Sequence, residues 1–175
     1  MSTAVLSLGS NLGDRLGYLR AAVAGFAEAA DTELVAASPV YETEPWGGVE
    51  QDDFLNAVLI VRSDELDEWG WLRRGQRLEQ AAGRVRGVHW GPRTLDVDVV
   101  AVFTGDDGSG PVHSEHPELL LPHPGAAERN TVLRPWCDVD PDAVLPGHGR
   151  VAELLARLGE AGMRRRDDLL LEPSR

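Results

Sequence analysis

Two aspartates, Asp96 and Asp98, stand one residue apart at the start of the apolar segment 94–103. Side chains two residues apart in a strand share one face, and their Cα atoms are about 6.5 Å apart. Carboxylates that face one point repel each other, and Mg²⁺ relieves this repulsion while also binding substrate phosphates. The pair therefore predicts a magnesium and phosphate site at the open end of a strand. The alternative is two solvated acids at the beginning of that strand.

Arginines crowd the stretch just before these aspartates. Residues 73–93 carry one acid, Glu79, and six arginines, in a chain whose net charge is −12: Arg73, Arg74, Arg77, Arg84, Arg86 and Arg93. Arginine forms paired hydrogen bonds to phosphate oxygens, and the glycines within residues 83–93 suit a loop that closes over phosphates. The stretch predicts binding of a compact polyanion, and the alternative is an exposed charged loop. Trp90 within it is a core anchor, a base-stacking group or a hinge of that loop.

Composition narrows the class of protein. All 17 basic residues are arginine, which excludes a lysine-containing phosphate loop of the G-x-x-x-x-G-K-[ST] type. Cys137 is the one cysteine, so an internal disulfide is impossible. The acidic net charge argues against nucleic acids and anionic membranes, and neither a signal-like start nor an apolar run of membrane length is present. We expect a cytoplasmic monomer with one domain, residues 1–175, that acts on small molecules.

A third set of residues could hold a flat polar ring. Phe54 and Asn56 share one face of a predicted strand, where a ring and an amide could grip a heterocycle, and Thr43 lies in the strand before. The alternative is that these are ordinary strand residues. His123, which follows Pro122, is likewise either structural or functional.

The order of the predicted elements indicates the fold. We expect strands at residues 3–8, 33–44, 54–62 and 94–103 and helices at residues 12–30 and 63–83. This strand–helix–strand–strand–helix–strand order is typical of a ferredoxin-like α+β sandwich, an antiparallel βαββαβ sheet with helices on one main face. Asp14 is expected early in the first helix and Ser63 as the cap of the second, while Pro39 indicates an edge or a bulge in the second strand.

The remainder of the chain is expected to form C-terminal extensions. Residues 104–117 are predicted to be a surface loop, and residues 119–123 a short apolar segment. A helical turn is expected to run from Pro124 to about Trp136, and a small helix to cover residues 151–158.

Six segments, in order along residues 4–147, resemble the 6-hydroxymethyl-7,8-dihydropterin pyrophosphokinase family. They are residues 6–14, 38–47, 54–57, 79–86, 90–98 and 121–124 with Arg129. Residues 90–98, which read WGPRTLDVD, are the most specific of these segments. The family has a ferredoxin-like fold, in agreement with the element order.

The resemblance implies transfer of the β,γ-diphosphate of ATP to the hydroxymethyl group of the pterin, with release of AMP, in tetrahydrofolate biosynthesis. It implies that Asp96 and Asp98 hold two Mg²⁺ ions and that Arg84 and Arg93 stabilise phosphoryl charge. It maps nucleotide binding onto Gln76, Glu79, Arg86, Trp90, Val99, His123 and Arg129. It maps pterin binding onto Thr43, Glu44, Trp46, Phe54 and Asn56, with Glu44 and Trp46 contributing backbone groups.

The sequence departs from the family pattern at the pterin end. The family commonly has Ala-Phe where this chain has Asn130-Thr131, and that Phe stacks on the pterin. His89 also stands where many members have another arginine, and Leu120 replaces a frequent polar residue near the nucleotide. These departures leave open a paralogue that binds nucleotide without catalysis. A D-x-D nucleotide-sugar transferase is a more distant alternative, for which the chain is short.

Overall fold

The computed structural model describes residues 1–85 and 91–172. The helices are α1 (Arg15–Ala27), α2 (Glu68–Ala81), α3 (Asn130–Val139) and α4 (Val151–Leu158), with a 3-10 turn η1 (Ala126–Glu128) before α3. The strands are β1 (Ser2–Ser10), β2 (Glu33–Ala37), β3 (Tyr41–Thr43), β4 (Phe54–Ser63), β5 (Asp96–Thr104), β6 (Gly110–Pro111), β7 (Ser114–His116), β8 (Leu119–Leu121), β9 (Val144–Leu145), β10 (Gly149–Arg150) and β11 (Met163–Arg165). In the described ranges, no helix is long and apolar enough to cross a membrane.

The main sheet confirms the predicted ferredoxin-like topology. Its strands lie in the order β11-β3-β4-β1-β5-β6, and β2 also pairs with β4. The paired strands run antiparallel to each other. The first and third predicted strands, β1 and β4, therefore lie side by side in the centre, as the split βαβ arrangement requires.

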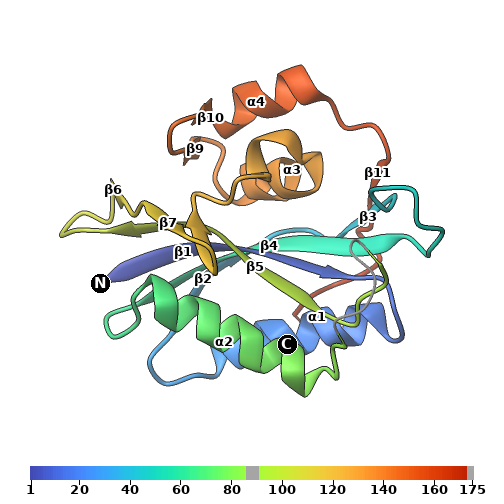
Figure 1. Cartoon of the computed structure of the whole chain (residues 1–175), viewed down its shortest axis with the longest axis horizontal. Coiled ribbons are helices and arrows are strands. Elements are labelled where there is room, and N and C mark those ends of the chain that lie inside the picture. The colour runs from blue at the N-terminus through green and yellow to red at the C-terminus, as the bar shows by residue number, and fades with distance from the viewer. Residues whose placement is uncertain (86–90, 173–175) are drawn as a thin grey trace.

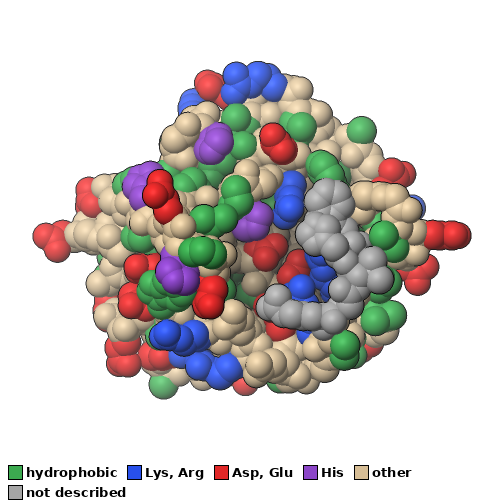
Figure 2. Space-filling view, in the orientation of Figure 1, with side chains coloured by type: hydrophobic (Ala, Val, Ile, Leu, Met, Phe, Trp, Pro, Cys, Tyr) green, Lys and Arg blue, Asp and Glu red, His purple; other side chains and the backbone are tan. Residues whose placement is uncertain are grey.

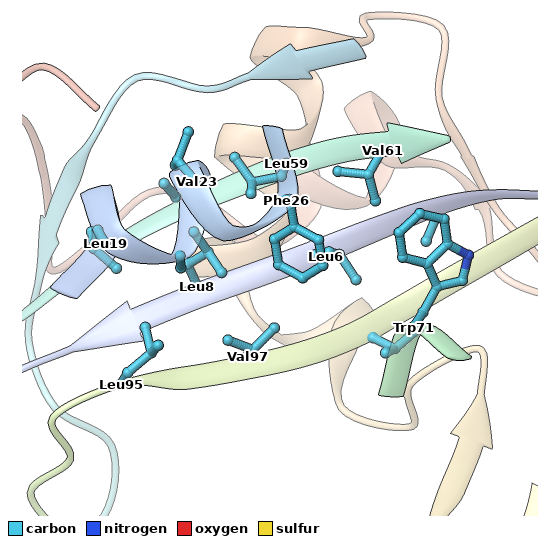
Figure 3. Close-up of a cluster of buried hydrophobic side chains, with 14 of the residues drawn as sticks. Leu6, Leu8, Leu19, Val23, Phe26, Leu59, Val61, Trp71, Leu95 and Val97 are labelled. Carbon is cyan, nitrogen blue, oxygen red and sulfur yellow. The ribbon is translucent and has the colours of Figure 1, made fainter. Parts of the chain in front are cut away.

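Helices cover both faces of this sheet (Figure 1). Helices α1 and α2 lie on one face and bury the larger apolar cluster, whose labelled members in Figure 3 include Leu8, Phe26 and Trp71. Helices α3 and α4 lie on the other face and bury a second cluster around Leu133 and Trp136. The sequence predicted helices on one main face of the sheet, and α1 and α2 form that layer. Helices α3 and α4 of the C-terminal extension cover the opposite face.

Strand alternation explains why both faces are apolar. Along β4, Leu55, Ala57 and Leu59 point into the first cluster, whereas Val58 points into the second. A two-sided apolar strand is expected where helices pack on both faces of a sheet.

Both helix starts in the N-terminal half differ from the sequence predictions. Asp14 precedes α1 as its N-cap and accepts a hydrogen bond from the Gly17 N–H at 3.0 Å. The prediction that Ser63 caps the second helix is wrong, because Ser63 ends β4 and the N-cap of α2 is Asp67. The Ser63 hydroxyl instead accepts from the N–H groups of Glu65 and Leu66, which forms a turn before the helix.

Other boundaries are also corrected. The predicted strand 33–44 is two strands, β2 and β3, separated at Ser38-Pro39-Val40, because proline cannot donate to the ladder. The β2–β4 register shifts between Leu34 and Ala36, so the expected irregularity falls just before Pro39. The predicted loop 104–117 contains β6 and β7, and β7 pairs with β8. The predicted helical turn is divided into η1 and α3, whereas α4 has its predicted bounds.

Candidate active site

A cavity of about 270 Å³ opens beside the start of α3, on the face of the sheet that carries the second apolar cluster. Acidic, arginine and histidine side chains gather in this hollow in the space-filling view (Figure 2). The described lining consists of Ser7, Gly9, Thr43, Glu44, Trp46, Phe54, Asn56, Arg84, Arg93, Asp96, Asp98, His123, Arg129, Thr131 and Val132.

The register of the central strands brings the polar lining together. Gly9 of β1 pairs with Asp96 of β5 on one side and with Asn56 of β4 on the other. Ser7, two residues earlier on the same face, pairs with Asp98. Strand residues two apart share a face, so these side chains all approach one cavity from the sheet. The prediction that Asp96 and Asp98 share one face of a strand is therefore confirmed.

Asp96 is the centre of an ion-pair network. Its Oδ1 accepts a hydrogen bond from Arg84 at 2.7 Å, and its Oδ2 accepts from Arg93 at 3.0 Å. Arg84 also contacts the buried carboxylate of Glu79, which sits near the end of α2. Each carboxylate oxygen of Asp96 therefore has an arginine partner. These two guanidinium groups therefore lie beside any phosphate that approaches Asp96.

Asp98 has a different electrostatic environment. Burial, followed by the negative charge of Asp96, raises the pKa of Asp98 to about 7. The positive charges of Arg129, Arg93 and Arg84 act in the opposite direction and only partly offset these effects. Asp98 is therefore a carboxylate whose charge is incompletely neutralised, and an added cation would stabilise its ionised form.

His123 enters the cavity as a neutral ring. Burial, followed by the positive charge of Arg129, lowers the pKa of His123. Its Nδ1 accepts a hydrogen bond from the Gly125 N–H at 3.1 Å, so Nε2 carries the proton of the neutral imidazole. Its backbone N–H donates to the Val100 carbonyl oxygen at 2.8 Å, which ties the residue to β5. His123 can therefore offer an N–H donor to an anion.

The opposite end of the cavity presents a ring and an amide. Asn56 Nδ2 donates to the Thr43 hydroxyl at 2.5 Å, which fixes the orientation of the amide. The Arg93 guanidinium carbon lies 5.9 Å from the centre of the Phe54 ring. Gly9 forms the floor, and a Cβ built there would come within 3.1 Å of Asn56 Oδ1. The missing side chain of Gly9 thus leaves room between the two ends.

Asn11 is a residue that sequence reasoning missed. Its Oδ1 accepts from the Arg93 N–H at 2.8 Å, and its Nδ2 donates to Gln51 Oε1 at 2.8 Å and to the Asp52 carbonyl oxygen at 2.9 Å. Buried Asn11 thereby joins the segment before β5 to the loop before β4. Its place in the turn after the first strand was visible in the sequence, but its distant partners were not.

The structure brings together most of the predicted site residues. The four predicted catalytic residues, the five predicted pterin residues, His123 and Arg129 all line the cavity. Gln76 and Glu79 lie on α2 outside this lining, although Glu79 reaches it through Arg84. Val99 points into the apolar cluster under α1 and α2, so only its main chain could face a ligand. Arg86 and Trp90 lie outside the described residues.

Three further residues line the cavity that were not predicted as site residues from the sequence. Ser7 and Gly9 belong to the cavity because they pair with Asp98 and Asp96 across β1 and β5. Val132 lines it from the first turn of α3. Strand pairing would have identified the first two, because residues opposite a predicted metal ligand face the same side.

The donor set fits a hard divalent cation. Within residues 1–85 and 91–172, no group of three or more His, Cys, Asp or Glu side chains forms a ready metal cluster. Mg²⁺ does not need one, because it is usually bound by one or two carboxylates together with water and substrate phosphates. Asp96 and Asp98, with the raised pKa of the latter, offer such a pair.

Comparison with known proteins identifies relatives along nearly the whole chain. Residues 5–141 match the family described as 7,8-dihydro-6-hydroxymethylpterin-pyrophosphokinase (HPPK). A protein of Mycobacterium tuberculosis named 2-amino-4-hydroxy-6-hydroxymethyldihydropteridine pyrophosphokinase is 50% identical over 166 residues, which cover 92% of this chain and 86% of the relative. A Bacillus subtilis protein of the same name is 38% identical over 136 residues, which cover 78% of this chain and 77% of the relative.

Solved structures agree on the fold. A crystal structure of Plasmodium falciparum HPPK-DHPS superposes with a TM-score of 0.68 at 13% identity and covers 94% of this chain. The match takes in only 46% of that longer solved chain. At this identity the likeness concerns the fold alone.

Proposed function

Because the chain belongs to the 7,8-dihydro-6-hydroxymethylpterin-pyrophosphokinase family, it is a pyrophosphokinase of folate biosynthesis, and we propose that its polar cavity binds ATP, Mg²⁺ and the hydroxymethyl-dihydropterin together. The observation that carries this proposal is the continuity of the cavity. One lining includes a carboxylate pair with arginines at one end and Phe54 with Asn56 at the other. A reaction between a polyphosphate and a heterocycle needs both ends within one site.

At the phosphate end, Asp96 and Asp98 would hold the Mg²⁺ ions, of which we propose two. Bound Mg²⁺ supplies positive charge that neutralises phosphate oxygens. Arg84 and Arg93, which pair with Asp96, would contact the transferred phosphoryl groups. His123 would donate its Nε2–H to a phosphate oxygen.

We assign the nucleotide to the same end of the cavity. Arg129, at the start of α3, would contribute a further cation. Gln76, Glu79, Arg86, Trp90 and Val99 complete the proposed nucleotide-binding set, Val99 through its main chain and Glu79 through its contact with Arg84.

At the pterin end, Phe54 would pack against one face of the ring. The amide of Asn56 would pair with the polar edge of the pterin, because its hydrogen bond to Thr43 holds it in one orientation. Glu44 and Trp46 would offer backbone groups from the strand end and loop that border the cavity. The hydroxymethyl group would then point toward Asp96 and Asp98, which lie on the neighbouring strand beyond β1.

The proposed reaction is a displacement at the β-phosphorus of ATP. The pterin hydroxyl oxygen forms a bond to that phosphorus, the bond from the phosphorus to the oxygen bridging to the α-phosphate breaks, and the hydroxyl proton is released. AMP leaves with the bridging oxygen. Positioning of the two substrates and stabilisation of charge by the arginines supply most of the rate.

The alternative of a paralogue that only binds nucleotide has no support among the relatives. The similar curated proteins described above are named as pyrophosphokinases. We further propose that residues 1–175 act as one domain, as a monomer in the cytoplasm.

Binding measurements on variants of the aspartate pair test the proposed site. Asp96→Ala and Asp98→Ala should weaken Mg²⁺-dependent binding of ATP at least tenfold in calorimetry, because each removes a carboxylate ligand. Asp106→Ala, at an exposed turn after β5, is the matched control and should bind as the wild type does. Circular dichroism would verify folding. Unchanged ATP binding by folded Asp96→Ala and Asp98→Ala proteins would refute the metal assignment.

A further inference from the structure

A group of charged side chains lies at the pterin end of the sheet, on the face away from the cavity. Its centre is Glu42 of β3, whose carboxylate contacts Arg15 of α1 at 3.2 Å, Arg166 at 3.0 Å and Arg164 of β11. Only 11% of the Glu42 side chain is exposed, so its charge depends on these cations for stabilisation. We propose that these four residues, the Glu42 cluster, position the pterin-binding residues; this rests on the pterin site proposed above.

Strand register shows which face of the sheet the Glu42 cluster occupies. Glu42 pairs with Leu55 of β4, and Leu55 points into the apolar cluster under α1 and α2. Residues opposite each other in paired strands share a face, so the Glu42 side chain points toward α1 as well. The next residue, Thr43, points to the other face and lines the cavity. The β3 backbone is therefore held, from the face opposite the cavity, at the residue before Thr43.

Arg15 joins the end of β3 to the chain that enters β4. Its Nη2 lies 3.2 Å from the Glu42 carboxylate, and its Nη1 donates to the Asp53 carbonyl oxygen at 2.9 Å. Asp53 immediately precedes Phe54, and Phe54 pairs with Thr43 across the two strands. One guanidinium group therefore holds the residues that adjoin Thr43 and Phe54. The spacing of these two proposed pterin-binding residues depends on that link.

The C-terminal segment holds Glu42 from the outer edge of the sheet. Strand β11 lies beside β3, with Arg164 opposite Glu42 (Figure 1). Just beyond β11, the Arg166 N–H donates to the Val40 carbonyl oxygen at 2.8 Å, while its Nη1 contacts Glu42. The Asp168 carboxylate accepts two hydrogen bonds from the Arg166 guanidinium group, at 2.9 and 2.8 Å, which orients that group. Glu42 is thus held between α1 and the C-terminal segment, and a change on either side reaches β3.

The influence of the Glu42 cluster should be limited to the pterin end of the cavity. Its contacts reach β3 and the start of β4, whereas Asp96 and Asp98 lie on β5, beyond β4 and β1. Loss of the cluster should therefore weaken pterin binding and leave nucleotide binding largely unchanged. A residue that only stabilises the fold would not separate the two substrates in this way.

Calorimetry on Arg15→Met and Glu42→Gln tests this proposal. Arg15→Met removes the link to Asp53 but leaves Glu42 with its two other arginines, so it is the milder change; Glu42→Gln removes the charge that three arginines share. Each folded variant should bind 6-hydroxymethyl-7,8-dihydropterin at least fivefold more weakly than the wild type does, in the presence of Mg²⁺ and α,β-methylene-ATP. Binding of α,β-methylene-ATP with Mg²⁺ should stay within twofold. Wild-type pterin affinity in Arg15→Met, or an equal loss of both ligands, would overturn the proposal.

The ion pair of Glu33 with Arg62 supplies a matched control. It joins β2 to β4 at the other end of β4, with 2.6 Å between Glu33 Oε2 and Arg62 Nη2. Glu33→Gln should therefore leave pterin binding within twofold of the wild type. A fivefold loss in Glu33→Gln would show that removal of any ion pair in the sheet has this effect, and the special role of the Glu42 cluster would be refuted.

A double variant tests whether Arg15 and Glu42 act together. The combined Arg15→Met and Glu42→Gln changes should weaken pterin binding by less than the product of the two single effects, because both disrupt one link. Effects that multiply would overturn the shared role. Failure of the underlying pterin site is recognised separately, through Asn56→Ala. If that variant binds the pterin as the wild type does, the pterin lies elsewhere, and the inference about the Glu42 cluster falls with the proposed site.

Discussion

The fold favours the protonated form of the Asp98 carboxyl group. Burial, followed by the charge of Asp96, raises its pKa from 3.8 to about 7 in the folded protein. The neutral carboxyl therefore favours the folded state, and the stability it confers is present below pH 3.8 and is lost as the pH rises through about 7. This cost of ionisation should be measurable, because one unit of pKa corresponds to about 1.4 kcal/mol.

We accordingly predict that Asp98→Asn gains stability relative to the wild type as the pH rises. The free energy of unfolding would be measured for Asp98→Asn and for the wild type between pH 4 and pH 7.5, without divalent cations. The advantage of the variant should grow by at least about 1.4 kcal/mol over that range. Asp106→Asn, at an exposed turn, serves as the control and should show no such trend. A constant difference between Asp98→Asn and wild type would contradict the account of Asp98.

Asn11 should position the cavity residues indirectly, through its hydrogen bonds to Arg93 and to the loop before β4. Asn11→Ala removes the acceptor for the Arg93 N–H and both donors to the loop before β4. We expect a loss of about 1–3 kcal/mol in unfolding free energy, because buried polar groups lose their partners. We also expect a higher KM for the pterin, measured by steady-state kinetics. A variant that loses stability with KM unchanged would show that Asn11 is merely structural.

Single residues differ in how well the sequence predicts their roles. The common face of Asp96 and Asp98 follows from the two-residue period of a strand, and the structure shows it. The same period places Val99 on the opposite face, which is why its side chain does not reach the cavity. Asn11 could not be predicted, because its partner Arg93 is 82 residues away along the chain.

At the scale of elements, helix α2 depends on the absence of a side chain at Gly75. A Cβ built on Gly75 would lie 2.9 Å from Val97 Cγ1 and 3.3 Å from Val97 Cβ. The glycine therefore lets α2 pack closely on β5, the strand that carries both aspartates. Helix α2 also carries Glu79, the partner of Arg84.

We predict that Gly75→Ala destabilises the protein by about 1–3 kcal/mol, as overpacked cores do. In an unobstructed helix the same change stabilises by about 1 kcal/mol, so the sign of the effect tests the contact. Chemical denaturation of Gly75→Ala, Val97→Ala and the double variant measures their coupling. The double variant should be more stable than the sum of the single effects predicts, because removal of the valine methyl groups makes room. Strict additivity would contradict the proposed packing.

Elements whose boundaries are set locally were predicted best from the sequence. Helix α4 has its predicted bounds, and β4 extends one residue further than expected. The start of α2 was predicted wrongly because Ser63 has the side chain of a cap but pairs with Ser2 across the sheet, which assigns it to β4. Strand β11 was missed because its short, charged segment gains its strand conformation only by pairing with β3.

At the scale of the whole molecule, one sheet serves two apolar cores. Leu59 is fully buried in the core under α1 and α2, and Leu133 is fully buried in the core under α3 and α4. Adjacent residues of β4 contribute to both cores, so neither can lose its packing without disturbing the strands of the other. The candidate active-site cavity lies where the second core ends, and Val132 belongs to both.

We therefore predict that Leu59→Ala and Leu133→Ala each give a single unfolding transition. Both should lower the unfolding free energy by about 2–5 kcal/mol. Calorimetric and spectroscopic unfolding curves should coincide for each variant. Two separate transitions in either variant would contradict the proposal of one domain.

The topology of the molecule could be predicted from element order, because short connections leave few ways to arrange strand, helix and strand pairs. The composition of the second layer could not, since it depends on how α3 and α4 return over the sheet. That layer places Arg129 and Thr131 above the strand residues and so completes the cavity.

Phosphorus NMR of the complete reaction tests most directly the claim that one cavity joins ATP to the pterin. The protein is mixed with ATP, Mg²⁺ and 6-hydroxymethyl-7,8-dihydropterin, and the products are identified by their phosphorus signals. We predict AMP and a pterin diphosphate in equal amounts, and no ADP. Formation of ADP with a pterin monophosphate, or hydrolysis of ATP with the pterin unchanged, would contradict the account.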